Sequence, residues 1–184
     1  MTPLPSLVER LTALQRRTRH SPRNREVRAV VRLRARDACE YCLLPTAAKF
    51  QIEHIIPPDL WDDYVHGLLP GVPSRPGRGG PNHIDNYAWA CPFCNQCKQD
   101  RVSHRVGRRL TRFFDPRHDH WPDHFAFAIG SAYLFTEGIS PEGRATEIGL
   151  GYNESGPEGP LVWRHVTIVD GGYPPAWARI IYDV

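Results

Sequence analysis

Two cysteine pairs of the form CxxC constrain this sequence more than any other feature. The first pair is Cys39 and Cys42, the second is Cys91 and Cys94, and 48 residues separate the pairs. Four thiolates at such spacing are typical of a closed, tetrahedral zinc site that holds a fold together. Four unrelated buried thiols are the weaker alternative, because small apolar cysteines rarely fall into two such pairs. We therefore predict one structural zinc ion bound by these four residues.

A fifth cysteine, Cys97, extends the second pair to CPFCNQC and could compete as a ligand. Four sulfur atoms already complete the shell of the ion, so we interpret Cys97 as a spare thiol. The first residues lack the apolar core of a signal peptide, and no stretch approaches the roughly 20 apolar residues of a membrane span. We therefore expect a cytoplasmic protein with reduced thiols and no membrane partner.

The formal charge of +3 is unevenly distributed along the chain. Residues 1–117 hold 20 Lys and Arg against 11 Asp and Glu, whereas residues 118–184 hold 3 against 9. Of the 23 basic residues 21 are Arg, whose planar guanidinium can bind phosphate through two parallel hydrogen bonds. The pattern points to a nucleic-acid partner, although a solvated surface in an Arg-rich protein explains the charge equally well.

Hydrophobic periodicity and capping residues predict three helices. The first covers residues 6–18 with Ser6 as N-cap, the second covers residues 24–37, and the third runs from Pro92 to about residue 105. In the second helix we expect one apolar and one basic face, formed by Val27, Val30 and Val31 on the inside and by Arg25, Arg28, Arg32 and Arg36 on the outside.

Strands are predicted where apolar and β-branched residues gather between Pro and Gly. The first two cover residues 50–56 and 87–90, and a loop rich in Pro and Gly over residues 59–81 joins them. Beyond residue 112 the chain becomes aromatic and acidic, and we expect further strands over residues 133–136 and 161–169. Helix, paired strands and helix thus surround the cysteines.

The segment between the cysteine pairs contains the residue types that phosphodiester hydrolysis requires. His54 is a candidate general base, because a large share of an imidazole is neutral at pH 7. Glu53 precedes it on the predicted strand and should point to the opposite face. The carboxylate of Glu53 and the amide oxygen of Asn95 are hard ligands suited to Mg²⁺ or Mn²⁺. Each residue alone is more often structural, but their joint position between the cysteine pairs favours the catalytic interpretation.

The runs CEYC, EHIIP, GGPNHIDNYAWAC and CNQCK resemble the HNH endonucleases over about residues 26–101. The resemblance implies an α+β fold with a ββα-metal (His-Me finger) core, here stapled by the four-cysteine zinc site and joined to N-terminal helices and a mixed C-terminal extension. We accordingly divide the chain into an N-terminal helix (1–23), a nuclease core (24–112) and an extension packed on the core (113–184).

The resemblance also implies roles for single residues. Glu53 matches the acid that binds the catalytic metal ion, and His54 matches the general base. Asn86 matches the central Asn that orients the loop carrying the base. Asn95 occupies the position of the final His or Asn, which is a ligand of the same ion. Lys98 completes the CNxxK pattern, as a phosphate contact or as a support for the helix end.

One departure from the family is an insertion over residues 59–78, where the family has only a few residues. Loops of this length are commonly functional or disordered. Four side chains in it could contact DNA or a partner protein, or could belong to a tolerated surface insertion: Trp61, Tyr64, Arg75 and Arg78.

The C-terminal runs FFDPRHDHWPDHFAF and GISPEGRATEIGLGYN are similar to a tail found in many bacterial HNH proteins. We interpret its aromatic residues, Phe113, Phe114, Trp121 and Phe125, as packing against the core. A second metal site could be imagined at His118, His120 and His124, but hydrogen bonding and packing are the more common roles of such residues.

Together these observations predict a metal-dependent HNH endonuclease that hydrolyses DNA with low sequence specificity, because Arg contacts to phosphate carry no base information. We expect DNA in a basic groove, with contacts from Arg28, Arg32, Lys98, Arg101 and Arg105. Two alternatives stay open. The chain could be the nuclease subunit of a larger defence or mobile-element assembly, docked through the insertion or the extension. It could also be a non-catalytic zinc module that binds nucleic acid.

Overall fold

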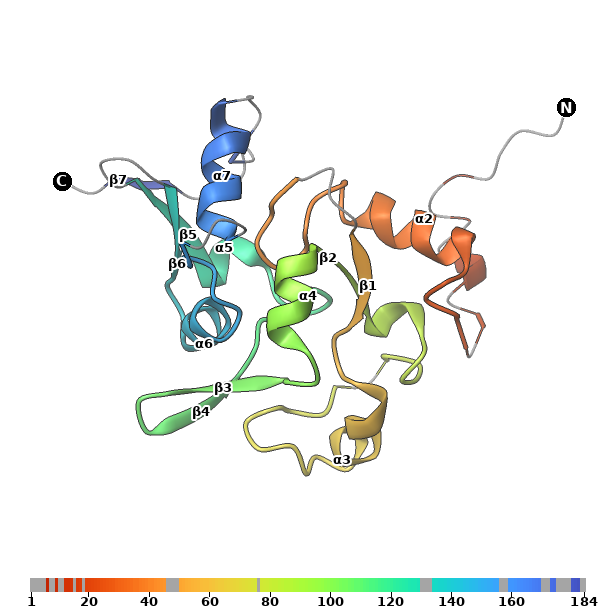
Figure 1. The fold of residues 1–184 in the computed structure, drawn as a ribbon. Helices are drawn as coiled ribbons and strands as arrows, with labels where there is room; N and C mark the ends of the chain where they lie inside the picture. Colours follow the sequence, from red (N-terminus) through yellow and green to blue (C-terminus); the bar gives the residue numbers. More distant parts are fainter. Residues whose placement is uncertain are drawn as a thin grey trace, which may run out of the picture.

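A computed structural model shows a mixed α+β chain in which short sheets and helices surround the cysteines (Figure 1). The structure describes residues 19–45, 50–75, 77–129, 134–155 and 159–169, together with Ser6, Glu9, residues 12–14, Arg16, Arg17, Tyr173, Pro174 and residues 180–182. Much of the helix predicted over residues 6–18 lies outside the described residues. Its start agrees with the prediction, because Ser6 and Glu9 exchange side-chain to backbone hydrogen bonds in a capping box.

Helix α2 (Arg25–Arg34) begins where the side chain of Asn24 caps it. The Oδ1 atom of Asn24 accepts hydrogen bonds from two backbone N–H groups of the first turn, at 2.8 and 3.2 Å. The helix ends before residue 37, the predicted end, because Arg36 and Asp37 adopt positive φ angles. The predicted apolar face is confirmed, and its buried residues are Val27, Val30 and Val31.

Strands β1 (Gln51–His54) and β2 (Tyr87–Ala90) pair antiparallel, and helix α4 (Pro92–Lys98) follows directly after Cys91. Strand β2 coincides with the prediction, and β1 occupies the middle of the predicted strand. The backbone N–H of Glu40 donates to Trp89 O at 2.9 Å, which brings the first cysteine pair beside β2. Both cysteine pairs therefore meet at the end of this hairpin.

The helix predicted over residues 92–105 is wrong in its second half. Gln99 adopts a φ of 49°, which ends α4, and the chain continues into a hairpin of β3 (Ser103–Val106) and β4 (Arg109–Arg112). Gly107, with a φ of 59°, forms the turn of this hairpin. A glycine between two short alternating runs is the sequence signal that would have predicted it.

The insertion at residues 59–78 is folded rather than a plain loop. It contains the 3-10 helix η1 (Pro58–Leu60) and helix α3 (Trp61–Val65), neither of which the sequence analysis predicted. Tyr64 is only 2% exposed and packs in a small apolar cluster with Ile56 and Val72. The insertion therefore contributes its own part of the core.

Two arginines of the insertion that could have contacted DNA or a partner bind the C-terminal part of this chain. Arg78 is 3% exposed, pairs with Asp115, and donates from Nε to the hydroxyl oxygen of Tyr64 at 3.1 Å. Arg75 Nη2 lies 3.4 Å from a carboxylate oxygen of Asp119. These contacts attach the insertion to the segment that follows the β3–β4 hairpin.

The described residues of the C-terminal part form a three-stranded sheet and three helices. The elements are α5 (Trp121–His124), β5 (Phe125–Ile129), β6 (Leu134–Gly138), α6 (Pro141–Gly149), α7 (Pro160–Val169) and β7 (Ile180–Tyr182). Strand β5 lies in the middle, antiparallel to β6 and parallel to β7. The strand predicted over residues 133–136 is confirmed from Leu134 onward, and Tyr133 lies outside the described residues.

The strand predicted over residues 161–169 is wrong, because these residues form α7. Their β-branched side chains favour a strand, but tertiary contacts override that preference. Leu161 and Arg164, one helical turn apart, are both buried. Arg164 donates to the backbone oxygens of Leu134, at 2.9 Å, and of Tyr152. One internal arginine thus joins α7 to two other segments.

One apolar cluster connects the cysteines with the C-terminal aromatic residues. It contains all four paired cysteines and the four aromatic residues for which packing was predicted, Phe113, Phe114, Trp121 and Phe125. Trp121 Nε1 donates to Tyr41 O at 3.0 Å, and the Tyr173 hydroxyl donates to Cys42 O at 3.3 Å. The first cysteine pair is therefore held from the C-terminal side as well. Among the described helices, none has the length and apolar character needed to cross a membrane.

Candidate functional site

The four cysteines predicted to bind zinc lie together and are buried. Their Sγ atoms are all within 4.8 Å of one another. Cys42 Sγ lies 3.8 Å from Cys91 Sγ, which matches the edge of about 3.8 Å in a tetrahedron with Zn–S bonds of about 2.3 Å. Within the described part of the chain no second group of His, Cys, Asp and Glu gathers in this way, and Cys97 lies outside the four. The donor set therefore fits a structural metal ion such as zinc.

The backbone around the cysteines is shaped to turn the sulfur atoms inward. Cys91 is the N-cap of α4, and its Sγ accepts from the N–H of Cys94 at 3.4 Å. Leu43, with a φ of 62°, donates its N–H to Cys39 O at 2.8 Å and closes the first turn. Burial raises the pKa of the Cys94 thiol well above its usual range, whereas hydrogen bonds from the neighbouring thiols, that of Cys39 first, lower the pKa of Cys42. A buried thiolate therefore requires the charge of a bound cation.

Three of the four predicted catalytic side chains line one open hollow of about 440 Å³. Glu53 and His54 come from the end of β1, and Asn95 comes from α4. The remaining lining residues are Pro57, Pro58, Gln96, Gln99 and Asp100. Strand alternation predicted that Glu53 and His54 point to opposite faces, yet both line this hollow. His54 is the last residue of β1, and the chain bends directly after it.

His54 is held in one orientation by two neighbours. Its Nε2–H donates to Asn82 Oδ1 at 3.1 Å, and its ring meets the edge of Tyr87 at a centroid distance of 5.0 Å. Burial lowers the pKa of His54 below its ordinary value, although the hydrogen bond to Asn82 acts in the opposite direction. The ring is therefore neutral at pH 7, and the Nδ1 lone pair is available to accept a proton.

Glu53 forms a buried ion pair with Lys98, the last residue of α4. Lys98 Nζ lies 2.8 Å from Glu53 Oε1 and donates to His54 O at 2.8 Å as well. Burial raises the pKa of Glu53, and the charge of Lys98 opposes that shift. Lys98 is 1% exposed, which favours the predicted role of supporting the helix end over the predicted contact with phosphate.

Asn86 does not line the hollow and instead ties together the backbone behind it. Its Oδ1 accepts from the N–H of Ile56 at 3.0 Å, and its Nδ2 donates to the carbonyl oxygens of Ile56 at 2.7 Å and of Pro81 at 2.9 Å. These bonds hold the end of β1 against the loop that contains Asn82. The positioning role that the resemblance implies for Asn86 is compatible with this geometry.

Two residues near the hollow were not identified from the sequence. Asn82 contacts the candidate base, and Asp100 brings a second carboxylate to the wall that Glu53 lines. Asn82 lies in the motif GGPNHIDN, but its spacing from His54 depends on the length of the insertion and carries no signal. Asn95 is oriented by Gln51, whose Oε1 accepts from Asn95 Nδ2 at 2.6 Å.

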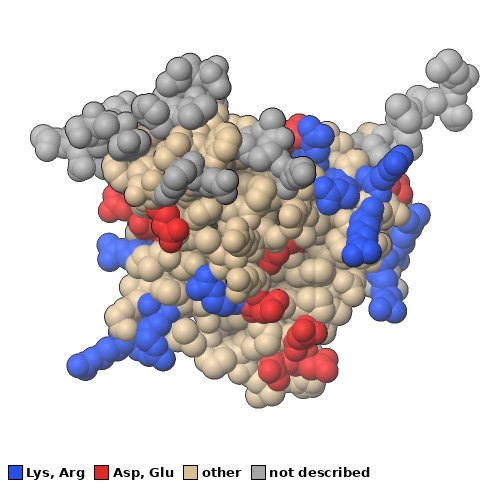
Figure 2. Space-filling model, in the orientation of Figure 1, with Lys and Arg blue, Asp and Glu red and all other residues tan. Residues whose placement is uncertain are grey.

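Basic side chains lie on two sides of this site. Figure 2 shows Lys and Arg over α2 and over the β3–β4 hairpin, and acidic side chains over α3. Of the predicted nucleic-acid contacts, Arg32, Arg101 and Arg105 are exposed. Arg28 is half-buried and lies over the Trp89 ring at 5.1 Å, so much of its side chain supports the fold. Arg101 donates to Gly149 O at 2.7 Å and lies over Phe113.

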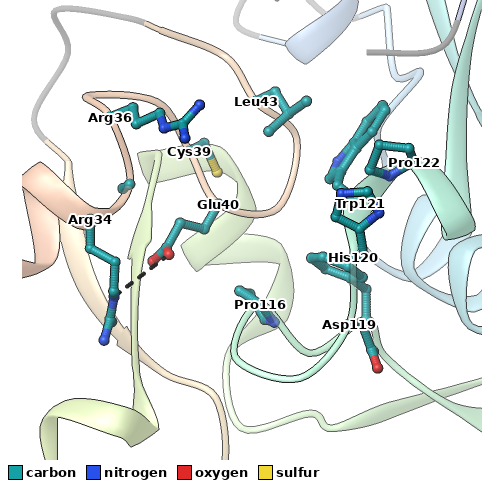
Figure 3. Close-up of a pocket in the computed structure, with 12 residues that line it drawn as sticks. Arg34, Arg36, Cys39, Glu40, Leu43, Pro116, Asp119, His120, Trp121 and Pro122 are labelled. Atoms are coloured by element: carbon teal, nitrogen blue, oxygen red, sulfur yellow. Dashed lines mark ion pairs between the residues drawn. The ribbon is translucent and has the colours of Figure 1, made fainter. Parts of the chain in front are cut away.

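A larger hollow of about 570 Å³ lies elsewhere, between the first cysteine pair and residues 116–122 (Figure 3). Arg34 and Glu40 form an ion pair at 3.9 Å on one wall. Asp119 on the opposite wall pairs with Arg112. Arg36 also lines this hollow, and no predicted catalytic residue does.

The three histidines considered for a second metal site do not converge. His118 contacts Asp115 at 2.9 Å, and His124 contacts the hydroxyl of Ser140 at 2.7 Å. His120 is exposed and lies 3.6 Å from Asp123. These contacts agree with the alternative interpretation, in which the three histidines serve hydrogen bonding and packing.

Comparisons of this chain with protein-family models, with curated proteins and with solved structures find no match. A functional assignment therefore depends on the geometry of the hollow and on the residue pattern of the chain.

Proposed function

We propose that the chain is a metal-dependent endonuclease of the HNH type that hydrolyses phosphodiester bonds in DNA. One observation carries the proposal: Glu53, His54 and Asn95, whose side chains suit metal binding and base catalysis, line the same hollow. A zinc module that only binds nucleic acid has no need for this combination. The four-cysteine centre beside the hollow stabilises the hairpin and helix that carry these residues.

In the proposed reaction His54 acts as general base. Its Nδ1 accepts a proton from water while Asn82 holds Nε2, so the water oxygen can attack phosphorus in line with the departing 3′ oxygen. The products would carry a 5′ phosphate. Asn86 acts indirectly, because its three hydrogen bonds keep the backbone on either side of His54 in place.

The oxygen atoms of Glu53 and Asn95 are suited to hold Mg²⁺ or Mn²⁺ at the hollow. Such an ion would supply positive charge to stabilise the negative charge that develops on the phosphate. Glu53 uses Oε1 for Lys98, which sets the orientation of the carboxylate toward the hollow. Low sequence specificity is expected, since the exposed arginines provide phosphate contacts rather than base contacts.

A plasmid-cleavage assay with Mg²⁺, Mn²⁺ or a chelator tests this proposal. The His54→Ala variant should lose about 100-fold or more of the rate, the usual contribution of a general base. His66→Ala is the matched control, because His66 is exposed on another helix end and should leave the rate unchanged. Zinc content is measured for every sample, so that loss of the structural ion is recognised.

The outcomes separate the alternatives. Cleavage by His54→Ala at the wild-type rate would overturn the proposed base. DNA binding without cleavage under any ion would favour the non-catalytic zinc module. Weak cleavage by the isolated chain that a partner protein strengthens would favour a subunit of a larger assembly.

A further inference from the structure

The β3–β4 hairpin belongs to the most basic segment of the chain. Residues 101–112 contain five arginines and no Asp or Glu. Two of these arginines support the fold, because Arg101 donates to Gly149 O and Arg112 pairs with Asp119. The other three are exposed, and within the described part of the chain no ion pair holds them: Arg105, Arg108 and Arg109.

The hairpin is held firmly where it leaves the core. Gly149 of α6 packs so closely on it that an added Cβ would lie 2.5 Å from the Phe113 ring and 3.1 Å from the Cβ of His104. Thr111 in β4 is buried. The three exposed arginines lie at and beside the turn, beyond this anchored part. They are therefore presented on a preorganised backbone, so little backbone conformational entropy is lost when they bind a ligand.

The hairpin also starts at the candidate active site. Gln99 and Asp100 line the hollow with Glu53 and His54, and β3 begins at Ser103. In Figure 1 the hairpin projects from the end of α4 on the side away from α2. A polyanion lying across the hollow would therefore meet basic residues of the hairpin on one side and those of α2 on the other (Figure 2).

We propose that this hairpin enters the major groove of duplex DNA beside the scissile phosphate and that Arg105, Arg108 and Arg109 bind the phosphates that border the groove. This inference rests on the proposed nuclease function, because that function places the scissile phosphate at the hollow beside the hairpin. Strands in a sheet lie about 4.8 Å apart, so a two-stranded ribbon fits a groove about 12 Å wide. Three exposed acids, Asp59 in η1 and Asp62 and Asp63 in α3, disfavour a path of the polyanion along these two helices.

The test is a binding titration of short duplexes with the full chain, without added Mg²⁺ or Mn²⁺, over a range of salt concentrations. Removing three phosphate contacts in the variant R105A/R108A/R109A should lower the magnitude of the salt slope by about 2.7. At about 0.1 M salt the affinity should fall by on the order of 100-fold. The charge-preserving control R105K/R108K/R109K should keep the wild-type slope. A second control, D62N/D63N, should change the affinity by less than about threefold.

A second arm compares duplex DNA with duplex RNA of the same sequence. The major groove of A-form RNA is too narrow for a ribbon, so the RNA should bind more weakly and should lose less affinity in the alanine variant. Equal loss for both duplexes would overturn entry into the groove. An unchanged DNA salt slope in the alanine variant, with zinc content and thermal unfolding intact, would overturn the hairpin as a DNA contact.

These outcomes are independent of cleavage. If the hairpin variant loses DNA binding but the wild-type chain cuts no DNA with any ion, the hairpin inference stands and the nuclease proposal fails. If the wild-type chain cuts DNA and the hairpin variant binds and cuts equally well, the nuclease proposal stands and the inference fails.

Discussion

Lys98 Nζ and Glu53 Oε1 lie 2.8 Å apart in an ion pair whose two side chains are 1% and 12% exposed. The pair joins the last residue of α4 to the end of β1, and a second bond from Lys98 reaches the carbonyl oxygen of His54. A single buried ammonium group therefore contacts two of the three residues that we propose for the chemistry, Glu53 and His54. The charged group can be buried because oxygen atoms accept its hydrogens, those of Glu53 and His54 at 2.8 Å and that of Gln99 at 3.5 Å.

Replacing Lys98 by Met should lower the free energy of unfolding by about 3 kcal/mol, because it leaves the Glu53 carboxylate buried without its partner. Urea denaturation in zinc-containing buffer measures the change. The double variant Lys98→Met with Glu53→Gln removes the buried charge and should recover part of the loss. If the single variant is as stable as wild type, the pair does not hold α4 to β1.

Replacing Cys94 by Ser should abolish stoichiometric zinc binding and unfold the hairpin, since zinc sites of this kind contribute roughly 10 kcal/mol of apparent folding energy. Cys97→Ser is the matched control and should retain one zinc ion per chain, because Cys97 lies outside the cluster. Elemental analysis measures the zinc content of each variant, and circular dichroism measures whether the chain is folded. Loss of zinc from the Cys97 variant, with retention in the Cys94 variant, would show that the ligand set is wrong.

Asn86→Ala should destabilise the chain by about 3 kcal/mol, because three backbone groups lose their buried partner. Asn82→Ala removes one side-chain hydrogen bond and should cost only about 1 kcal/mol. Denaturant titrations compare the two alanine variants directly. Equal costs would mean that the three hydrogen bonds of Asn86 do not support the backbone more than the single bond of Asn82 does.

His20 predicts a dependence of stability on pH. Its ring contacts Leu14 O at 2.8 Å and accepts from the N–H of Ile84 at 3.0 Å, so the native state requires the neutral form. Burial lowers the pKa of His20 below its ordinary value of 6.5, while the hydrogen bond to Leu14 opposes the shift. The unfolded chain therefore binds a proton at higher pH than the folded chain. Stability should be greatest above 6.5 and fall as the pH drops through the folded pKa.

The measurement is the free energy of unfolding of wild type and of His20→Gln, obtained by denaturant titration at pH values above and below the ordinary histidine pKa. Wild type should lose more stability on acidification than the variant, since the variant has no proton to gain at this position. If the free energy of unfolding changed with pH in the same way in both proteins, His20 would not be the group that causes the loss of stability. The result also reports on the candidate site, because His20 N–H donates to Asn82 O at 2.7 Å and so supports the loop that contacts His54.

Several features could be predicted from residue spacing alone. The CxxC pairs predict a thiolate cluster wherever the pairs meet, and the apolar period of Val27, Val30 and Val31 predicts the inner face of α2. The alternating and capped segments around them predict β1, β2 and the start of α4. Such features depend on a few neighbouring residues, so no knowledge of distant contacts is needed.

Other features were decided by contacts between distant residues. Residues 161–169 have strand-forming side chains but adopt a helix, in which buried Arg164 donates to the backbone oxygens of Leu134 in β6 and of Tyr152. The cationic side chains of Arg78 and Lys98 suggest an exposed surface, but both are buried against carboxylates that precede or follow them by more than thirty residues. Charge alone does not reveal whether a side chain meets solvent or an acid.

The sequence by itself therefore determined the cysteine frame and the residue types available beside it, because ligand chemistry and local periodicity are properties of short segments. Only the tertiary structure decided that Glu53, His54 and Asn95 line one hollow and that the arginines after α4 form an exposed hairpin. The reason is that burial and ion pairing between distant segments are worth several kcal/mol, whereas local preferences are worth less than about 1 kcal/mol per residue.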